Sequence, residues 1–244
     1  MTSIIAESAS IAEDVSMGHF CVIGENVTIG VDCRIGHHII IHDDTEIGEG
    51  CIIDDHAVLG KAPLRSRSMA LDPTTDLPPL RLSDRVVIGT SAIVFRGSTI
   101  GQDGLVADLA SVREESSVGD ASIVGRGVAV ENKVRIGARC KIEAGAFICA
   151  FTEIGDDCFI APEVTLTNDN YLGRTEERKQ HYAGAIVRRG GRIGANATIL
   201  PGRRVGENAV AGAGSVVTKD ISPETISVGV PSRSLKGVPP EQRI

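Results

Sequence analysis

The sequence predicts an all-β fold, a parallel β-solenoid of about ten triangular coils with two projecting loops and a short C-terminal tail or helix. Three observations lead to this prediction. Apolar residues recur at every sixth position, glycine often follows them, and the composition is poor in large rings, with 28 Gly but 5 Phe, 2 Tyr and no Trp in 244 residues. A period of six fits neither a helix nor a simple pair of strands, but it is typical of solenoids in which each hexad is one short strand and a turn. Small and β-branched residues suit a narrow interior filled by thin layers.

The repeat falls into three runs. Three hexads close one coil, so residues 18 apart should stack about 4.8 Å from one another. The repeat positions in the three runs are Ile5, Ile11, Met17, Ile23, Ile29, Ile35, Ile41, Ile47, Ile53 and Leu59; then Ile88, Val94, Ile100, Val106, Val112, Val118, Val124, Val130, Ile136, Ile142, Ile148, Ile154, Ile160 and Leu166; then Val187, Ile193, Ile199, Val205, Ala211 and Val217. We therefore assign residues 1–222 to a β-helix domain and residues 223–244 to a C-terminal extension.

A second inward-facing position should follow each repeat residue by four. Five cysteines occupy it, and small residues such as alanine and valine fill it elsewhere: Cys21, Cys33, Cys51, Cys140 and Cys158. Cysteine in such a slot behaves as a compact core residue, and the spacing matches neither a zinc motif nor a disulfide framework. Arg203 occupies the same slot after Ile199. Either the coil bulges there, or the guanidinium group reaches an edge and meets a carboxylate.

Two segments interrupt the repeat, 61–85 and 167–186, and both should project from the coil, where they could form the wall of a groove. Arg65 and Arg67 in the first segment are candidates to meet the phosphates of a nucleotide-linked substrate. The alternative is a solvated loop that holds a neighbouring subunit. The second segment begins "TNDNYLGRTEERKQHYAG", and its substrate-binding candidates are Asn170, Tyr171, Arg174 and His181.

Stacking by 18 residues places polar side chains beside the second loop. Asn168 shares a column with Arg96, Glu114, Asn132 and Ala150, and a neighbouring column contains Arg113 and Glu131. Solvent-facing columns of a solenoid are usually small or variable residues, so Arg, Glu and Asn next to a projecting loop predict a polar groove. Asn132 and Glu131 are therefore candidates for substrate binding and catalysis.

The third run resembles a known family. "GGRIGANATILPGRRVGENAVAGAGSVVTKDI" followed by "SVGVPSR" is similar to the C-terminal half of left-handed β-helix acyltransferases that use acetyl-CoA. Together with "TNDNY", it resembles most the N-acetyltransferases of nucleotide-linked amino sugars, of the dTDP-3-amino-3,6-dideoxyhexose or UDP-3-amino-glucuronate type. The resemblance implies a left-handed coil, a homotrimer, and acyl-CoA bound in the cleft between two subunits.

The same resemblance assigns roles to individual residues. It implies that Asn168 and Asp169 lie at the sugar, and that Lys219 and Arg233 meet the phosphates of CoA. The backbone at four small residues would line the pantetheine channel: Gly194, Ala195, Gly212 and Ala213. Several relatives carry a carboxylate one coil before the Asn, where this chain has Ala150, so either Glu131 or Asp169 supplies it or the acceptor differs.

The chemistry favours an amine acceptor. A hydroxyl is a poor nucleophile that needs a general base, most often His, whereas a neutral amine needs mainly positioning. The polar column contains no His, so we expect N-acylation, with Asn168 or Asp169 orienting the amine. His181 is the reservation, because its loop could carry it into the cleft. O-acylation by the same fold is the alternative.

Other function classes fit less well. His19 stacks over His37 and His38 over His56, with His42 nearby, as in β-helix carbonic anhydrases, but a metal needs three or four convergent ligands and no later coil adds one, so no metal is expected. A solenoid without catalysis would bind no acyl-CoA. A net charge of −7 argues against nucleic acid. With no apolar run near the ~18 residues of a membrane span and no signal-peptide pattern, we expect a cytoplasmic protein.

Overall fold

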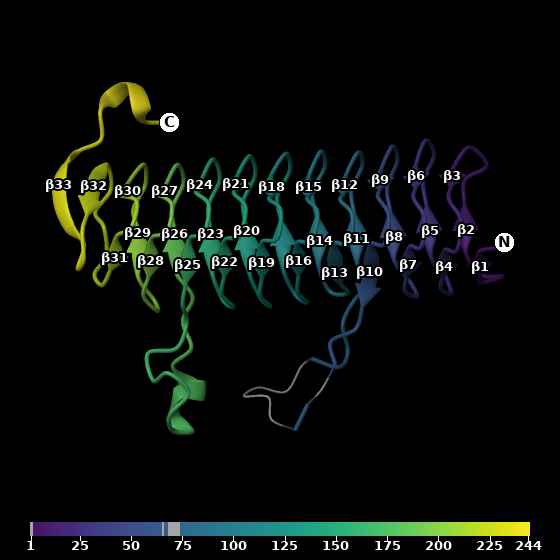
Figure 1. Cartoon of the computed structure of the whole chain (residues 1–244), viewed down its shortest axis with the longest axis horizontal. Helices are drawn as coiled ribbons and strands as arrows, with labels where there is room; N and C mark the ends of the chain where they lie inside the picture. The colour runs from purple at the N-terminus through teal and green to yellow at the C-terminus, as the bar shows by residue number, and fades with distance from the viewer. Residues whose placement is uncertain (1, 65, 68–73) are drawn as a thin grey trace.

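The computed structural model describes residues 2–64, 66–67 and 74–244. These residues form a prism of three parallel sheets, here called A, B and C, with consecutive strands passing from A to B to C (Figure 1). Sheet A contains β1 (Ile4–Ile5), β4 (Val22–Ile23), β7 (Ile40–Ile41), β10 (Val58–Lys61), β13 (Ile93–Phe95), β16 (Ser111–Val112), β19 (Ala129–Val130), β22 (Phe147–Ile148), β25 (Thr165–Leu166), β28 (Thr198–Ile199) and β31 (Val216–Val217).

Sheet B contains β2 (Ser10–Ile11), β5 (Thr28–Ile29), β8 (Glu46–Ile47), β11 (Arg81–Leu82), β14 (Thr99–Ile100), β17 (Ser117–Val118), β20 (Arg135–Ile136), β23 (Glu153–Ile154), β26 (Ile186–Val187) and β29 (Arg204–Val205). Sheet C contains β3 (Ser16–Met17), β6 (Arg34–Ile35), β9 (Ile52–Ile53), β12 (Val87–Ile88), β15 (Leu105–Val106), β18 (Ile123–Val124), β21 (Lys141–Ile142), β24 (Phe159–Ile160), β27 (Arg192–Ile193), β30 (Val210–Ala211), β32 (Thr225–Val228) and β33 (Arg233–Gly237). The all-β solenoid agrees with the prediction, while the 11, 10 and 12 strands in the three sheets give slightly more coils than the ten predicted.

The core is the narrow interior predicted from the repeat. From Ile23 onward the repeat residues are buried, and so are all six cysteines, which carry free thiols. Small polar side chains in the second inward slot bond to the coil above them: Ser116 Oγ donates to the carbonyl of Glu131 at 2.9 Å, and Cys140 Sγ to that of Gly155 at 3.0 Å. Burial raises the pKa of the Cys51 thiol to about 11, which keeps it protonated and structural.

Glycine follows many repeat residues because the next coil fills the space beside it. A Cβ on Gly101 would lie 2.4 Å from Oδ1 of Asp120 and 2.7 Å from its backbone nitrogen. That Oδ1 accepts a hydrogen bond from the N–H of Gln102 at 2.9 Å. Gly137, Asp156 and Ala138 repeat the arrangement two coils later. A glycine and an aspartate 19 residues further on are therefore one structural unit.

Arg203 settles the alternative left open above. Its guanidinium group reaches the edge of the coil, where Nη1 lies 3.9 Å from Oδ1 of Asp220 and Nε donates to the carbonyl of Pro201 at 3.3 Å. The side chain remains partly exposed, so the interior slot carries no charge. The second alternative, an arginine at the edge beside a carboxylate, is the observed one.

Both loops leave the prism from the same corner, where the chain turns from sheet A to sheet B (Figure 1). The first connects β10 to β11, and the second, which contains the 3-10 helix η1 (Glu177–Gln180), connects β25 to β26. The returning end of the first loop lies on the next coils, since Thr74 Oγ1 donates to Oε2 of Glu115 at 2.7 Å. This corner, called the A–B corner below, is the feature that organises the candidate site.

The C-terminal extension is a β-hairpin rather than a tail. β32 continues sheet C by pairing parallel to β30, and β33 turns back antiparallel to β32 before the 3-10 helix η2 (Pro240–Gln242). Ser227 on β32 is buried and Ile226 pairs with Val210, so these residues prolong the repeat by one more strand. No helix in the part of the chain that the structure describes is long and apolar enough to cross a membrane.

Candidate functional site

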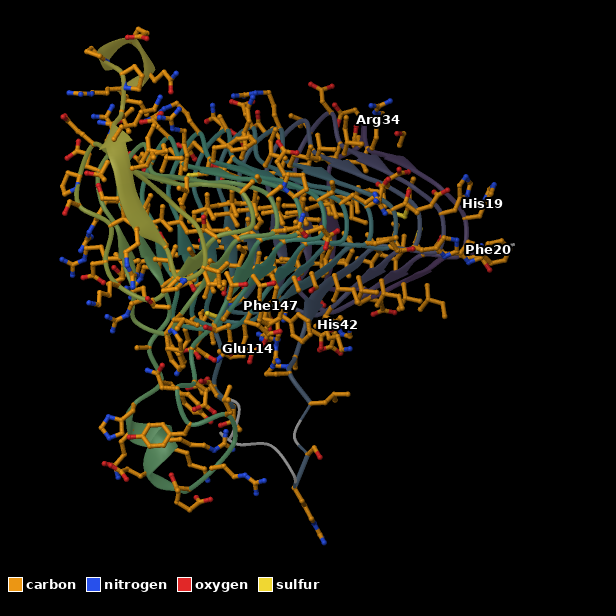
Figure 2. All side chains as sticks on the ribbon, turned by 60° about the vertical axis from the view of Figure 1, so that its left-hand side comes forward. His19, Phe20, Arg34, His42, Glu114 and Phe147 are labelled. Carbon is orange, nitrogen blue, oxygen red and sulfur yellow. The ribbon has the colours of Figure 1, made fainter. Side chains whose placement is uncertain are left out.

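The A–B corner carries charged and polar side chains on the coils between the two loops. The turns after β13, β16 and β19 contribute Arg96, Arg113 with Glu114, and Glu131 with Asn132. These turns stack as predicted, because the N–H of Lys133 donates to the carbonyl of Glu114 at 3.1 Å. Figure 2 shows Glu114 on the side of the prism from which both loops extend.

Glu114 is the most buried charge of this corner, with 2% of the residue exposed. Arg113 donates two hydrogen bonds to its carboxylate, from Nε at 3.0 Å and from Nη2 at 2.9 Å, and its Nη1 lies 3.4 Å from Oε2 of Glu131. The guanidinium group also lies 5.6 Å from the ring centre of Phe95. A buried carboxylate is stable only when it is paired and hydrogen-bonded, so Arg113 holds two carboxylates on the corner. The sequence analysis placed Glu114 in the polar column but did not name it as a site residue.

Asp169 organises the second loop. Its carboxylate accepts hydrogen bonds from the N–H groups of Tyr171 at 2.8 Å and Gly173 at 2.9 Å, and it pairs with Nη1 of Arg178 at 3.1 Å. Desolvation opposes ionisation, but the two N–H donors and Arg178 outweigh it and lower the pKa of Asp169 below its usual value. An Asp that bonds the backbone two residues on forms an Asx turn. Both oxygens are therefore used to shape the loop.

The other acceptor candidates in this loop differ in their surroundings. Asn168 is half-buried and its carbonyl accepts from the N–H of Ala183 at 3.1 Å, while its side chain has no hydrogen-bond partner among the described residues. Tyr171 stacks on His181 at 5.7 Å between ring centres. Asn170 and Arg174 are exposed. Asn168 is thus a half-buried loop side chain that is free to bind, whereas Asn170 and Arg174 point to solvent.

The loop is fixed to the A–B corner by aromatic contacts. Tyr182 stacks on Phe151 with 6.5 Å between ring centres, and Arg178 lies 5.7 Å from the ring centre of Tyr182. The fold brings the residues of the second loop together with the corner, whereas Arg67 in the first loop is exposed and makes no ion pair or hydrogen bond with them. Arg65 lies outside the described residues.

The donor candidates lie on the other edge of sheet A. Gly194 and Ala195 form the turn from β27 to β28, and Gly212 and Ala213 form the turn above it, from β30 to β31. A Cβ on Gly194 would lie 2.5 Å from the nitrogen of Ala213, so the stacking of these coils itself requires glycine. This edge, where sheet C turns to sheet A, is called the C–A corner.

Lys219 and Arg233 come together at the C-terminal end of the prism. They line a cavity of about 230 Å³ that is completed by β32, β33 and the turn at Asp220–Ser222. Two cations at one hollow suit a phosphorylated ligand, because guanidinium and ammonium groups make strong charge-assisted hydrogen bonds to phosphate. The two residues are separated in sequence but line one cavity because the hairpin folds β33 back along β32.

The outer surfaces of the sheets differ in chemistry. Outward side chains on sheet A include Ile4, Val22, Ile40 and Phe147, and they are 69%, 41%, 39% and 40% exposed. Sheet B instead carries ion pairs, such as Arg81 with Glu46 and Arg135 with Glu153. Sheet A therefore has exposed apolar side chains on its outer surface, between the A–B corner and the C–A corner.

The histidines divide between the two edges. His19 stacks on His37 and His38 on His56, at 5.4 and 4.9 Å between ring centres, as predicted. Figure 2 shows His19 at the N-terminal tip of the prism, away from Glu114. Within the described ranges no group of three or more His, Cys, Asp or Glu side chains is arranged to hold a metal ion.

The A–B corner also carries a histidine, His42, outside the polar column that contains Asn168 and six strands of sheet A away from it. It follows β7, lies on the A–B corner, and is seen in Figure 2 on the same side as Glu114. Partial burial lowers the pKa of His42, and Lys61 and Arg96 lower it further against the opposing effect of Asp43. A histidine kept neutral in this way can accept a proton. The 18-residue spacing did not connect His42 to the later coils, because the first loop lies between β10 and the next strand of sheet A, β13.

Comparisons with known proteins point to one family. Residues 133–168 match the family described as "Bacterial transferase hexapeptide (six repeats)", and residues 190–219 match "Hexapeptide repeat of succinyl-transferase". The galactoside O-acetyltransferase of Escherichia coli (strain K12) is 41% identical over 88 residues, which are 35% of this chain and 43% of that protein. The dTDP-3-amino-3,6-dideoxy-alpha-D-galactopyranose 3-N-acetyltransferase of Aneurinibacillus thermoaerophilus is 45% identical over 58 residues, 24% of this chain and 30% of that protein.

Among solved structures, that of the Arabidopsis UDP-N-acetylglucosamine acyltransferase superposes with a TM-score of 0.57 at 17% identity, covering 98% of this chain and 75% of that chain. At this identity the likeness concerns the fold alone, a left-handed parallel β-helix, and it confirms the handedness implied by the resemblance. The chain spans less than half the length of the first curated relatives that it matches.

Proposed function

This chain belongs to the hexapeptide-repeat acyltransferase family of left-handed β-helix proteins, and we propose that it transfers an acetyl group from acetyl-CoA to the amino group of a nucleotide-linked amino sugar. The relative that acetylates dTDP-3-amino-3,6-dideoxy-galactopyranose supports this acceptor class, since it matches at 45% identity over 58 residues. A 3-amino-deoxyhexose is therefore the first acceptor to test.

The observation that carries the proposal is the position of the two residue sets on opposite edges of sheet A. Asn168 lies on the A–B corner, whereas Gly194 and Ala213 lie on the C–A corner. One protomer cannot bring its own two edges together, because the width of the sheet separates them. If the apolar surface of sheet A faces a threefold axis, the A–B corner of one protomer meets the C–A corner of the next, and such head-to-tail contacts close a ring. The active site would then be shared between the subunits of a homotrimer.

In this arrangement the donor enters along the C–A corner. The small residues from Gly194 to Ala213 allow pantetheine to approach the main chain closely, and Lys219 and Arg233 bind the phosphates of CoA in the cavity that they line. Arg67 of the first loop is exposed and is our candidate for the phosphates of the nucleotide. The thioester carbonyl then faces the partner's second loop.

Positioning accounts for most of the chemistry. The neutral amine attacks the thioester carbonyl, a C–N bond forms, the C–S bond breaks, and the proton lost from nitrogen goes to the departing thiolate. We assign the orientation of the amine to Asn168, whose side chain has no other partner, and the shape of the loop to Asp169. Glu131 and Asn132, two coils below, would bind sugar hydroxyls. Holding reactants in this way is a large contribution to acyl transfer.

A second candidate is O-acyl transfer, for which the second loop supplies His181. A hydroxyl acceptor needs a general base, most often His, and His181 lies on the same loop as Asn168, with Nε2 3.5 Å from Oε1 of Glu177. General-base catalysis is worth roughly 10² to 10⁴ in rate. Under O-acylation, His181→Gln would lower kcat by that factor, whereas under N-acylation it would leave kcat nearly unchanged.

The deciding experiment is a panel of acceptors with acetyl-CoA, in which thiol release is measured and the product is identified by mass spectrometry. The panel pairs each nucleotide-linked amino sugar with its hydroxyl counterpart. Turnover of a 3-amino sugar above its hydroxyl counterpart supports N-acetylation. Faster turnover of the hydroxyl counterpart, abolished in His181→Gln, would replace it by the second candidate. Failure to bind acetyl-CoA in a direct titration would rule out both and leave a non-catalytic solenoid.

A further inference from the structure

A second cavity opens on the third corner of the prism, where sheet B turns to sheet C. Its volume is about 610 Å³, and it is lined by the turn after β26, by β29 with its following turn, and by the chain at 220–223. The side chains and backbone that line it belong to Arg188, Arg189, Arg204, Gly206, Glu207, Asp220, Ile221, Ser222 and Pro223. It shares the turn at 220–222 with the cavity that Lys219 and Arg233 line, but its three arginines belong to the B–C corner and to sheet B, outside that cavity.

Three arginines of this cavity come from adjacent coils. Arg189 is held by Asp157, with 3.1 Å from Nε to Oδ2. Arg188 and Arg204 have no ion-pair or side-chain hydrogen-bond partner among the described residues. Two guanidinium groups therefore face one hollow with their donors unused.

Neighbouring arginines on the same two surfaces behave differently. On sheet B, Arg81 pairs with Glu46 at 3.0 Å, and on the same corner Arg85 pairs with Asp103 at 2.7 Å and Arg139 with Asp157 at 2.6 Å. On sheet B and on this corner, the described arginines of the coils before β26 are therefore paired with carboxylates. In a chain of net charge −7, the loss of these partners at a cavity is a local departure from the rest of the surface.

We propose that this cavity binds a phosphorylated small molecule, with Arg188 and Arg204 as the groups that hold its phosphates. Guanidinium groups match phosphate oxygens in bidentate geometry, and a volume of about 610 Å³ falls in the range of roughly 300–1,000 Å³ of small-molecule sites. Ile221 and Pro223 provide an apolar wall for the organic part of the molecule.

The two carboxylates of the cavity are compatible with an anionic ligand. Asp220 is already engaged, because its Oδ1 accepts from the N–H of Arg204 at 3.0 Å and lies 3.9 Å from Nη1 of Arg203. Glu207 is exposed, and its carboxylate has no partner among the described residues. This carboxylate can therefore accept a hydrogen bond from a hydroxyl group of the ligand. With three arginines and two acidic residues, the lining of the cavity carries a net positive charge.

The test is calorimetric titration of the full chain with pyrophosphate and, in a second arm, with ADP. Both arms use a Lys219→Ala/Arg233→Ala background, which removes the two cations assigned to the phosphates of CoA. The variant is Arg188→Gln/Arg204→Gln. The matched control is Arg135→Gln, which makes the same change on sheet B outside the cavity. Thermal midpoints check that each variant is folded, and the single variants replace the double one if it is not.

The expected result is saturable binding that weakens at least tenfold in Arg188→Gln/Arg204→Gln and is unchanged in Arg135→Gln. Equal affinities for pyrophosphate and ADP would show that the cavity recognises the phosphates alone. Tighter binding of ADP would show that the apolar wall of Ile221 and Pro223 also contacts the nucleoside. The proposal is wrong if neither probe binds at millimolar concentration, if the control loses as much affinity as the variant, or if an acidic peptide displaces pyrophosphate at equal concentration.

Discussion

Arg113 holds the carboxylate of its own neighbour in the chain, Glu114, through hydrogen bonds of 3.0 and 2.9 Å, in a turn where Glu114 is 2% exposed. Residues adjacent in a strand point to opposite sides of the sheet. Arg113 and Glu114 can pair because both lie in the turn that follows β16, not in the strand itself. The pair places a fixed charge network, completed by Glu131, beneath the loop that we assign to the acceptor.

Arg113→Met should destabilise the fold by about 3 kcal/mol, because it leaves a buried carboxylate without its counter-charge. Urea unfolding monitored by circular dichroism measures this change. Arg113→Met/Glu114→Gln should recover part of the loss, since no buried charge remains. Arg135→Met, which breaks the exposed pair with Glu153, is the control and should cost less than about 1 kcal/mol. Equal losses for the two arginines would contradict the argument.

Gly101→Ala should cost about 1–3 kcal/mol through overpacking. The added methyl group would meet the carboxylate and backbone nitrogen of Asp120 at 2.4 and 2.7 Å, and a coil in a stack cannot shift alone. Gly127→Asn is the comparison, because nothing lies within 4 Å of a Cβ there and Asn tolerates its φ of +65°. The thermal midpoint should fall clearly only for Gly101→Ala.

Arg192→Met should leave stability unchanged or raise it by about 1 kcal/mol. Nε and Nη2 of Arg192 are buried without a hydrogen-bond partner among the described residues, and a buried unsatisfied donor costs about 1–3 kcal/mol. Methionine has a similar length and no such donors. Because Nη1 makes only one long bond, 3.4 Å to Oε1 of Gln242, a loss above about 1 kcal/mol in guanidinium unfolding would mean that Nε and Nη2 have a partner, such as water or an anion, in solution.

Acid should loosen the second loop through Asp169. Its pKa is lowered in the folded chain, so the stabilisation is complete above the ordinary carboxyl pKa of about 3.9 and is lost as the pH falls through the lower folded value. The amides of Tyr171 and Gly173 donate hydrogen bonds to this carboxylate, so their hydrogen-exchange rates report the change. Asp169→Ala should show the fast exchange already at neutral pH, and slow exchange in this variant would contradict the assignment.

Lys219→Ala should raise KM for acetyl-CoA about tenfold and leave kcat nearly unchanged, because a charge-assisted contact to phosphate contributes equally to substrate and transition state. Initial rates with the preferred acceptor separate the two constants. Lys236→Ala, on exposed β33, carries the same charge change outside the cavity and should have no effect. A fall in kcat alone would place Lys219 elsewhere in the reaction.

Parts of the candidate site were within reach of the sequence. The 18-residue stacking correctly placed Arg113, Glu114, Glu131 and Asn132 on adjacent columns next to the second loop. It missed His42, because the first loop breaks the column that would have connected it to Phe95. It also could not foresee that both oxygens of Asp169 are taken by its own loop, since Asn and Asp serve equally well as turn residues and as binding residues.

By itself, the sequence determined the prism, its core and the identity of the stacked residues, because burial at a period of six depends only on side-chain size and polarity along the chain. The tertiary structure alone decided that both loops leave one corner, that Lys219 and Arg233 share a cavity, and that the extension is a hairpin on sheet C. These relations join residues separated by insertions or reversals, where no period applies. Their geometry follows from the path of the backbone, which local patterns do not specify.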